Sequence, residues 1–313
     1  MSLEHWESYY RGGALASCPM SFEPGYTREV RQAWAGFFAE LPDGARILDL
    51  GTGNGAIPAI AVEAAAALGR RFEIDAVDLA QIDPTRYVAD GSRLLAGVRF
   101  HAGVSAEGLP FEPASFDAVT GQYALEFMEV GKVLQEVYRV LKPGGLAQFV
   151  LHHADSILLQ NVHESLAHAD LILDGTKVLR KFRRYLDAER EDPNRAQGPW
   201  QELVQAGEAL QKAAKDSQQS MTLMLNLDSL RTLFEMRGRT PPAAMAATID
   251  RMEQDLRASV RRMQDVRRAA RTQSDIAGLV QVAQALGFDD IRFEAQLFAG
   301  DKLVGWRLRL RRD

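Results

Sequence analysis

The 313-residue sequence is poor in cysteine and carries no excess of basic residues. A single cysteine excludes an internal disulfide and every zinc site built from several cysteines. The net charge of −5 at pH 7 gives the whole chain no basic footprint of the kind that nucleic-acid-binding proteins present. We therefore expect no structural metal and no nucleic-acid partner.

Long apolar runs are also absent. No uninterrupted apolar stretch is long enough to span a bilayer. Residues 1–11 are polar and aromatic, without the apolar centre of a signal peptide. Hydrophobic residues make up 46% and charged residues 25% of the chain, which is ordinary for a globular protein. These features predict a soluble, cytoplasmic protein that does not bind membranes.

The most informative stretch is residues 47–55, ILDLGTGNG. It predicts a short strand ending at an acidic residue, a glycine turn, and a helix over residues 56–68. Glycines are needed where the backbone turns sharply and a ligand lies directly on it, and the helix N-terminus adds unpaired N–H groups. Dinucleotides and S-adenosylmethionine (SAM) both use such a turn. Asp49 favours SAM, because a carboxylate there would repel a pyrophosphate but suits an ammonium and a sulfonium.

Two motifs in the right order carry a family resemblance. D-L-G-T-G-N-G at residues 49–55 resembles the first motif of class I SAM-dependent methyltransferases, and R-V-L-K-P-G-G at residues 139–145 is a second match. Residues 103–111 resemble the family's G-D-A-x-x-L-P-F segment, but Ser105 stands in place of the usual Asp and one residue is inserted. The resemblance covers about residues 45–151 and the closing segment, and it implies SAM as the cofactor.

The resemblance implies an α/β fold with a Rossmann-like, doubly wound sheet. This sheet is mostly parallel with an antiparallel last strand, and an all-helical insertion interrupts it. The SAM-binding core is expected at residues 45–153 and 272–313, and an N-terminal helical segment or flap at residues 1–44. Residues 154–271 show apolar residues at helical spacing and are expected to form a cap over the site. We also expect a homodimer through this insertion.

The ends of the predicted strands supply the expected cofactor contacts. Asp78 follows the second strand, where both nucleotide classes hold the ribose hydroxyls, and a helix cap is the alternative. The aromatic segment that contains Tyr9 and Tyr10 is expected either to pack on the core or to cover the cofactor. Ser105, or the main chain near Ala106, is expected at the adenine. The predicted cofactor-binding residues are Asp49, Gly51, Thr52, Gly53, Asn54, Gly55, Asp78, Leu79, Ser105, Ala106, Gln122, Tyr9 and Tyr10.

Candidates for a general base follow the fourth and fifth strands. Methyl transfer is an in-line displacement at an activated sulfonium methyl, so a base is needed only when the acceptor must lose a proton. The predicted catalytic residues are Tyr123, Glu126, His152 and His153. Histidine suits proton transfer near neutral pH, although one of the two histidines could simply end the strand while the other bonds a main-chain carbonyl. No paired acidic motif supports a metal.

The function predicted from these residues is methyl transfer from SAM to a small-molecule acceptor, at O or N. Methylation of nucleic acid or protein is a rival, but residues 121–124 read G-Q-Y-A and lack the N-P-P-Y signature. Non-methylating SAM chemistry, such as an intramolecular cyclisation, would use the same pocket, and a SAM-sensing scaffold would need no acceptor. The basic run from Arg257 to Arg271 is expected to be a solvated helix face, unless it contacts RNA.

Overall fold

The computed structural model describes residues 3–17, 26–217 and 220–313. The N-terminal segment expected at 1–44 is therefore described in part. The chain divides into two compact units, one of Met1–Leu159 with Asp265–Asp313 and one of Gln160–Gln264. The second unit is shorter than the insertion predicted at 154–271, because helices α7 (Ile157–Asp170) and α11 (Pro242–Ala269) belong partly to each unit.

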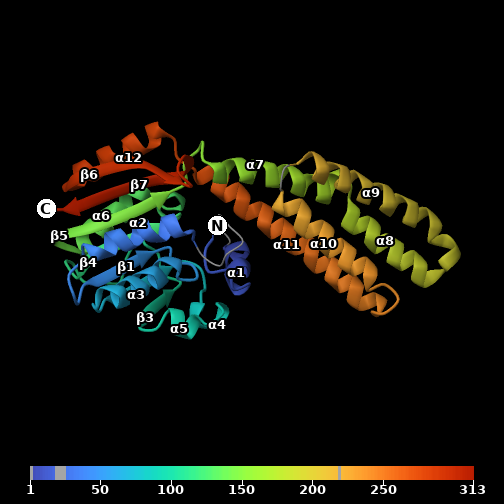
Figure 1. Cartoon of the computed structure of the whole chain (residues 1–313), viewed down its shortest axis with the longest axis horizontal. Helices are drawn as coiled ribbons and strands as arrows, with labels where there is room; N and C mark the ends of the chain where they lie inside the picture. The colour runs from blue at the N-terminus through green and yellow to red at the C-terminus, as the bar shows by residue number, and fades with distance from the viewer. Residues whose placement is uncertain (1–2, 18–25, 218–219) are drawn as a thin grey trace. The chain divides into compact units, whose positions relative to one another are not determined.

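The first unit is built on a seven-stranded sheet with the order β3-β2-β1-β4-β5-β7-β6 (Figure 1). Its parallel strands are β1 (Arg46–Leu50), β2 (Glu73–Asp78), β3 (Val98–Ala102), β4 (Phe116–Gln122) and β5 (Leu141–Leu151). An antiparallel hairpin completes the sheet, with β7 (Lys302–Arg312) inserted between β5 and β6 (Phe288–Phe298). The doubly wound order and the inserted antiparallel strand confirm the predicted fold class.

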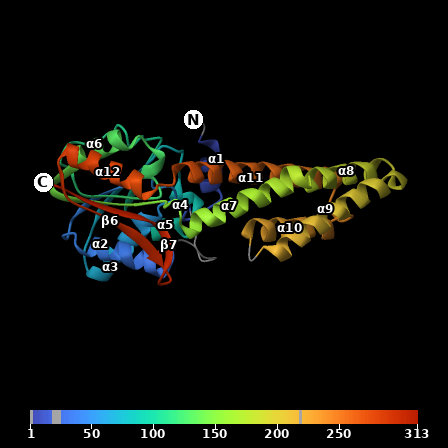
Figure 2. The same ribbon diagram turned by 90° about the horizontal axis from the view of Figure 1, so that it is seen from above.

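Helices cover both faces of this sheet. Figure 2 shows α6 (Val130–Val140) and α12 (Gln273–Leu286) on one face, and α2 (Arg28–Ala39) and α3 (Ala56–Leu68) on the other. The helix expected after β2 is reduced to two single turns, α4 (Pro84–Tyr87) and α5 (Gly91–Leu94). Proline at the first position of α4 fits the truncation that the sequence predicted there.

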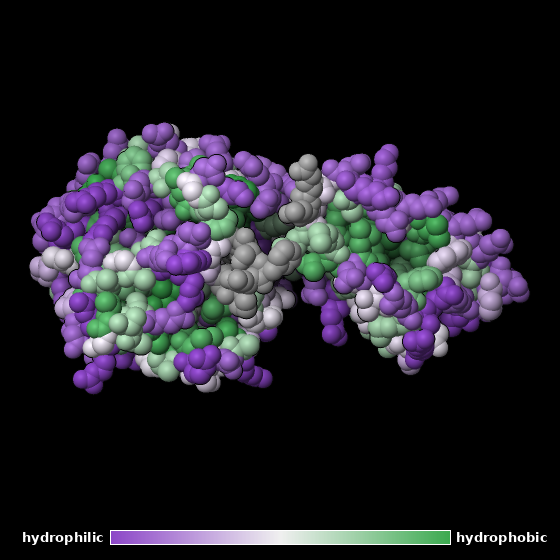
Figure 3. Space-filling view, viewed as in Figure 1, coloured by the Kyte–Doolittle hydropathy of each residue, from purple (hydrophilic) through white to green (hydrophobic). Residues whose placement is uncertain are grey.

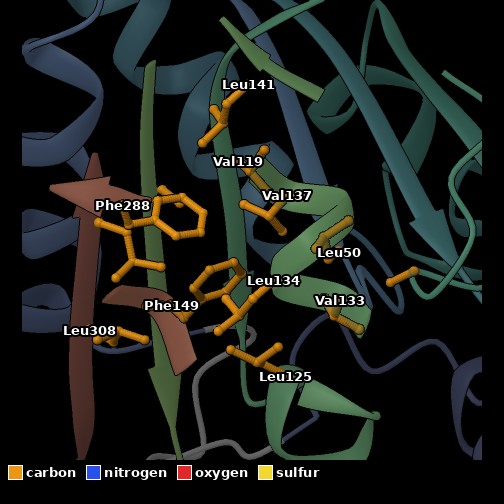
Figure 4. Packing of buried hydrophobic residues seen from close by; sticks show 14 of the residues in the cluster. Leu50, Val119, Leu125, Val133, Leu134, Val137, Leu141, Phe149, Phe288 and Leu308 are labelled. Carbon is orange, nitrogen blue, oxygen red and sulfur yellow. The ribbon is translucent and has the colours of Figure 1, made fainter. Parts of the chain in front are cut away.

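A contiguous apolar core joins the sheet to α6 and α12. Figure 4 shows Phe149 of β5 and Leu134 and Val137 of α6 pointing toward one another, and all three side chains are fully buried. Strands β1, β4 and β5 are buried on both faces over most of their length, as expected for a parallel sheet covered by helices. This packing holds the carboxyl ends of the central strands in fixed positions.

The second unit is helical, with α8 (Val178–Glu191), α9 (Gln197–Asp216) and α10 (Met221–Glu235) beside its parts of α7 and α11. Its core includes Phe182, Leu210 and Leu223. Apolar spacing alone predicts that α10 starts at Asp228, but the Ser220 hydroxyl accepts a hydrogen bond from the Leu223 N–H and caps a helix that begins at Met221.

Apolar residues also reach the surface of this unit, where Figure 3 shows green patches. On α10 the exposed large apolar side chains are Met221, Met224, Leu225 and Phe234. The homodimer expected through the insertion stays a prediction. Within the described ranges, no helix is both long and apolar enough to cross a membrane.

Candidate functional site

A cavity of about 380 Å³ lies in the first unit at the carboxyl ends of β1, β2 and β4. Sheet order reverses between β1 and β4, and ligands of open α/β sheets bind at such a switch point. Its volume lies in the range of small-molecule sites. The walls include eleven of the predicted site residues: Tyr10, Asp49, Gly51, Thr52, Gly53, Asn54, Asp78, Leu79, Gln122, Tyr123 and Glu126.

The glycine turn after β1 is held in a conformation that favours glycine. Gly51 has φ +60° and Gly53 has φ +52°. A Cβ added to Gly53 would lie 2.7 Å from Cε1 of Tyr10, so the missing side chain lets helix α1 (Glu4–Arg11) lie directly on the turn. The Asn54 amide donates to the main-chain carbonyls of Tyr10 and Ala14 at 2.9 and 2.8 Å. The aromatic segment is thus fastened to the turn and also forms part of the cavity wall.

Two acidic residues at strand ends face this turn. Asp49 is buried and accepts a hydrogen bond from the Thr120 hydroxyl at 2.7 Å. Burial raises the pKa of Asp49 to about 7, although the hydrogen bond from Thr120 opposes the rise. Burial also raises the pKa of Asp78, whose carboxylate accepts from the main-chain N–H groups of Gly53 and Ala80, each at 2.8 Å. Asp78 therefore fixes the shape of the turn as well as lining the cavity.

Residues after β4 form the opposite wall. The Trp34 indole N–H donates to Oε1 of Gln122, which fixes the orientation of that amide. Nε2 of Gln122 is buried without a hydrogen-bond partner and is available as a donor to a ligand. Tyr123 has φ +54°, a strained conformation of a kind that recurs at functional sites. Its ring lines the cavity, but its hydroxyl, which was predicted to be catalytic, donates a hydrogen bond to the Val304 carbonyl at 3.1 Å.

Glu126 and His152 form a buried pair next to the cavity. Glu126 lies in the short helix η1 (Leu125–Phe127) after β4, and His152 follows β5. Oε1 of Glu126 accepts from the His152 main-chain N–H at 2.8 Å and lies 2.7 Å from Nδ1 of the same residue. Oε2 is buried and has no hydrogen-bond partner. In this arrangement Oε2 can accept a proton or a hydrogen bond from a ligand.

Six predicted residues do not line the cavity: Tyr9, Gly55, Ser105, Ala106, His152 and His153. The Tyr9 hydroxyl donates to the Ala16 carbonyl at 2.9 Å, and the Ser105 hydroxyl oxygen accepts from the Glu107 N–H at 3.2 Å. Ala106 is part of the apolar core, and the adenine contact expected from Ser105 or from the main chain near Ala106 stays a prediction. His152 stands behind Glu126 and reaches the cavity only through it.

His153 does not line the cavity, so the structure gives no support to the prediction that it is a base. Its ring stacks on Trp306 with the centroids 4.3 Å apart, and its Nδ1 accepts from the Asp155 N–H at 3.0 Å. Burial lowers the pKa of His153, so the neutral form is favoured. Strand β5 ends at Leu151, and the His153 main chain pairs with Arg271 in an isolated parallel bridge.

The sequence analysis missed other cavity residues, among them Trp6, Tyr26, Phe127, Asp265 and Arg268. Asp265 accepts from the Trp6 indole at 3.3 Å and from Arg268 at 2.5 Å, and it lies 2.6 Å from Nε2 of His5. The aromatic cluster at residues 4–13 was a usable signal for Trp6. Nothing in the sequence separated Asp265 and Arg268 from the basic run of α11. Across the described residues, no group of three or more His, Cys, Asp or Glu could hold a metal ion.

Comparison with known proteins identifies a matching family and similar proteins. Residues 47–145 match a family described as "Methyltransferase domain". The ubiquinone/menaquinone biosynthesis C-methyltransferase UbiE of Rhizobium leguminosarum bv. trifolii is 33% identical over 126 residues, covering 39% of this chain and 47% of that protein. UbiE of Brucella anthropi is 39% identical over 101 residues, covering 31% of this chain and 37% of that protein. The chain thus spans half or less of the length of these relatives.

Solved structures are similar to part or nearly all of this chain. A [4+2]-cyclase, SpnF, is 25% identical with a TM-score of 0.36, covering 48% of this chain and 56% of that one. A second similarity is to Haemonchus contortus phosphoethanolamine N-methyltransferase 2, at 13% identity and a TM-score of 0.44, covering 98% of this chain and 56% of that one. The matched family, the two sequence motifs and the sheet order agree, and together they support a class I SAM-dependent methyltransferase domain in the first unit.

Proposed function

We propose that this chain transfers the methyl group of SAM to a small-molecule acceptor, at O or N. The observation that carries the proposal is the Glu126 side chain, which lines the cavity and has one buried carboxylate oxygen, Oε2, without a hydrogen-bond partner. Buried polar groups are normally hydrogen-bonded, so an orphaned acceptor at a cavity wall indicates a ligand with a hydrogen to donate. An acceptor hydroxyl or amine is such a ligand.

The residues around the turn fit the cofactor. Asp49 offers a carboxylate to a cationic ligand, Asp78 retains acceptor capacity for ribose hydroxyls, and the orphaned Nε2 of Gln122 offers a donor. When bound there, SAM supplies a methyl group that is already activated. Trp6 and Tyr10 of α1 form the wall on the side of the turn, where they exclude water from the ligand.

Glu126 takes the acceptor's proton, and His152 positions it. With Oε1 held by two donors of His152, the carboxylate has one fixed orientation and one free oxygen. A base positioned in this way typically contributes ~10²–10⁴-fold to the rate. Arg271 also fixes the segment, because its guanidinium donates to the main-chain carbonyl of Glu126 at 2.8 Å.

The proposal is tested by incubating the protein with methyl-deuterated SAM and a small-molecule extract of the source cells. We expect labelled small molecules and a matching amount of S-adenosylhomocysteine (SAH). Glu126→Ala should reduce labelling by at least ~10²-fold while SAH affinity is kept. Glu129→Ala is the matched control, because Glu129 is an exposed acid three residues away that does not line the cavity.

Three outcomes would contradict the proposal. Label that appears only in protein or nucleic acid would mean a macromolecular acceptor. Conversion of an extract component without formation of SAH would mean that SAM chemistry other than methyl transfer operates. Equal labelling by wild type and Glu126→Ala would show that Glu126 is not the general base.

A further inference from the structure

Five aromatic side chains line the same cavity as Glu126. Trp6 meets Phe127 edge-on, with the ring centroids 5.8 Å apart, and lies 6.2 Å from Tyr10. On the far side, Tyr123 lies 6.3 Å from Tyr26. All five rings line the cavity. The face of an aromatic ring attracts cations, most strongly where water is excluded.

The same walls are acidic. Among the residues that the structure describes, four acids line the cavity, Asp49, Asp78, Glu126 and Asp265, against one arginine, Arg268. Protein groups already engage three of these acids: Thr120 bonds Asp49, two main-chain N–H groups bond Asp78, and Arg268 bonds Asp265. Over the described part of the chain, Oε2 of Glu126 is the one buried carboxylate oxygen without a hydrogen-bond partner.

The geometry of Glu126 dictates what it can bind. An ionised carboxylate accepts hydrogen bonds and donates none. The main-chain N–H and Nδ1 of His152 both contact Oε1, so Oε2 is the oxygen left to contact a ligand. A carboxylate or phosphate on the ligand would be repelled there. An ammonium can donate hydrogen bonds to the carboxylate, neutralise its charge and interact with the aromatic faces, whereas a hydroxyl can only donate a hydrogen bond.

We propose that the methyl acceptor is an amine, bound through its ammonium group by Oε2 of Glu126 in the cavity that Trp6, Tyr10, Tyr26, Tyr123 and Phe127 line. This inference rests on the proposed function and narrows it to N-methylation. The ammonium gives one proton to Oε2, and the freed lone pair forms the N–C bond. The S–C bond breaks and its electron pair stays on sulfur. A methylated ammonium and neutral SAH leave, and Glu126 returns its proton to solvent.

The test uses three probes with similar aromatic skeletons: phenethylamine, 2-phenylethanol and 3-phenylpropionate. Each is titrated calorimetrically into the full chain saturated with SAH. We expect phenethylamine to bind at least ~10-fold more tightly than 2-phenylethanol, and 3-phenylpropionate to bind most weakly. Glu126→Gln should weaken phenethylamine roughly 10-fold to 100-fold, the scale of a hydrogen bond to a charged group, and leave 2-phenylethanol within about 3-fold.

Controls separate this inference from the proposed function. Glu129→Gln removes the same charge outside the cavity and should keep the preference for phenethylamine. Binding of 2-phenylethanol as tight as that of phenethylamine, unchanged preference in Glu126→Gln, or no binding of any probe would overturn the amine assignment. Failure of SAH itself to bind the wild-type chain would instead overturn the proposed function.

Discussion

At the scale of single residues, Gly53 joins the cofactor turn to the helix that lies on it. Replacing Gly53 by Ala places a methyl group 2.7 Å from the Tyr10 ring and demands φ +52° of an alanine. Gly44 is the matched control, with φ +76° and no atom within 4 Å of an added Cβ. We expect both variants to lose about 1 kcal/mol of unfolding free energy from the positive φ alone. Gly53→Ala should lose more than Gly44→Ala.

Only Gly53→Ala should also weaken SAH binding, because only there does α1 have to move. Chemical denaturation and calorimetry measure the two effects. Equal SAH affinity in both variants would mean that Tyr10 does not help to form the site.

Asp49 links SAM binding to pH. Burial raises its pKa to about 7, so the free protein holds this carboxyl partly protonated near neutral pH. A bound ammonium and sulfonium favour the ionised form and lower that pKa, so binding should release up to about one proton near pH 6–7 and almost none at pH 9. Calorimetry in buffers with different ionisation enthalpies measures the release. Asp49→Asn should abolish it, and proton release that is the same at pH 6 and pH 9 would contradict the assignment.

At the scale of elements, a charged cluster ties β1, β2 and β3 together away from the cavity. Buried Asp75 of β2 accepts hydrogen bonds from Arg46 of β1 and Arg99 of β3, and it lies 2.9 Å from the His101 ring. Burial alone would raise the pKa of Asp75, but these partners outweigh it and lower the pKa to about 2. The folded value lies below the unfolded value of about 3.9. The resulting stabilisation is therefore complete above about pH 5 and is lost as the pH falls toward 2.

We expect the wild type to lose roughly 1 kcal/mol more unfolding free energy than Asp75→Asn between pH 6 and pH 3, from this difference in pKa. Urea denaturation at the two pH values measures it. Asp289→Asn is the control, because its partner Arg311 is exposed and the pair should contribute little. The same pH dependence in Asp75→Asn and wild type would show that the cluster is not what lowers this pKa.

Elements differ in how far the sequence predicted them. Strand β1, its glycine turn and α6 can be predicted from local sequence, because apolar periodicity and glycine positions are visible within a short stretch of residues. The start of α10 was missed because Ser220, its cap, lies outside the apolar pattern. In the site, the residues after β1, β2 and β4 were found from strand ends. The presence of Asp265 in the site depends on contacts between segments that are far apart in the sequence. The same holds for Glu126, which lines the cavity whereas His153 does not. No local sequence pattern shows such contacts.

At the scale of the whole molecule, the helical insertion is proposed to control the acceptor rather than the cofactor. The cofactor residues all lie in the first unit, whereas Gln160–Gln264 form a unit with a separate apolar core. SAH alone should slow amide hydrogen exchange around Gly51, Asp78 and Gln122. Protection within the insertion should require an acceptor as well. Exchange in the insertion that is indifferent to both ligands would make it a partner-binding module.

The central claim is that the cavity beside the glycine turn binds SAM and its product. Its most direct test is calorimetric titration of the full chain with SAH and, separately, with NAD. We predict saturable binding of one SAH per chain and no heat of binding from NAD, because Asp49 disfavours a pyrophosphate at this turn. Binding of NAD without any response to SAH would contradict the account.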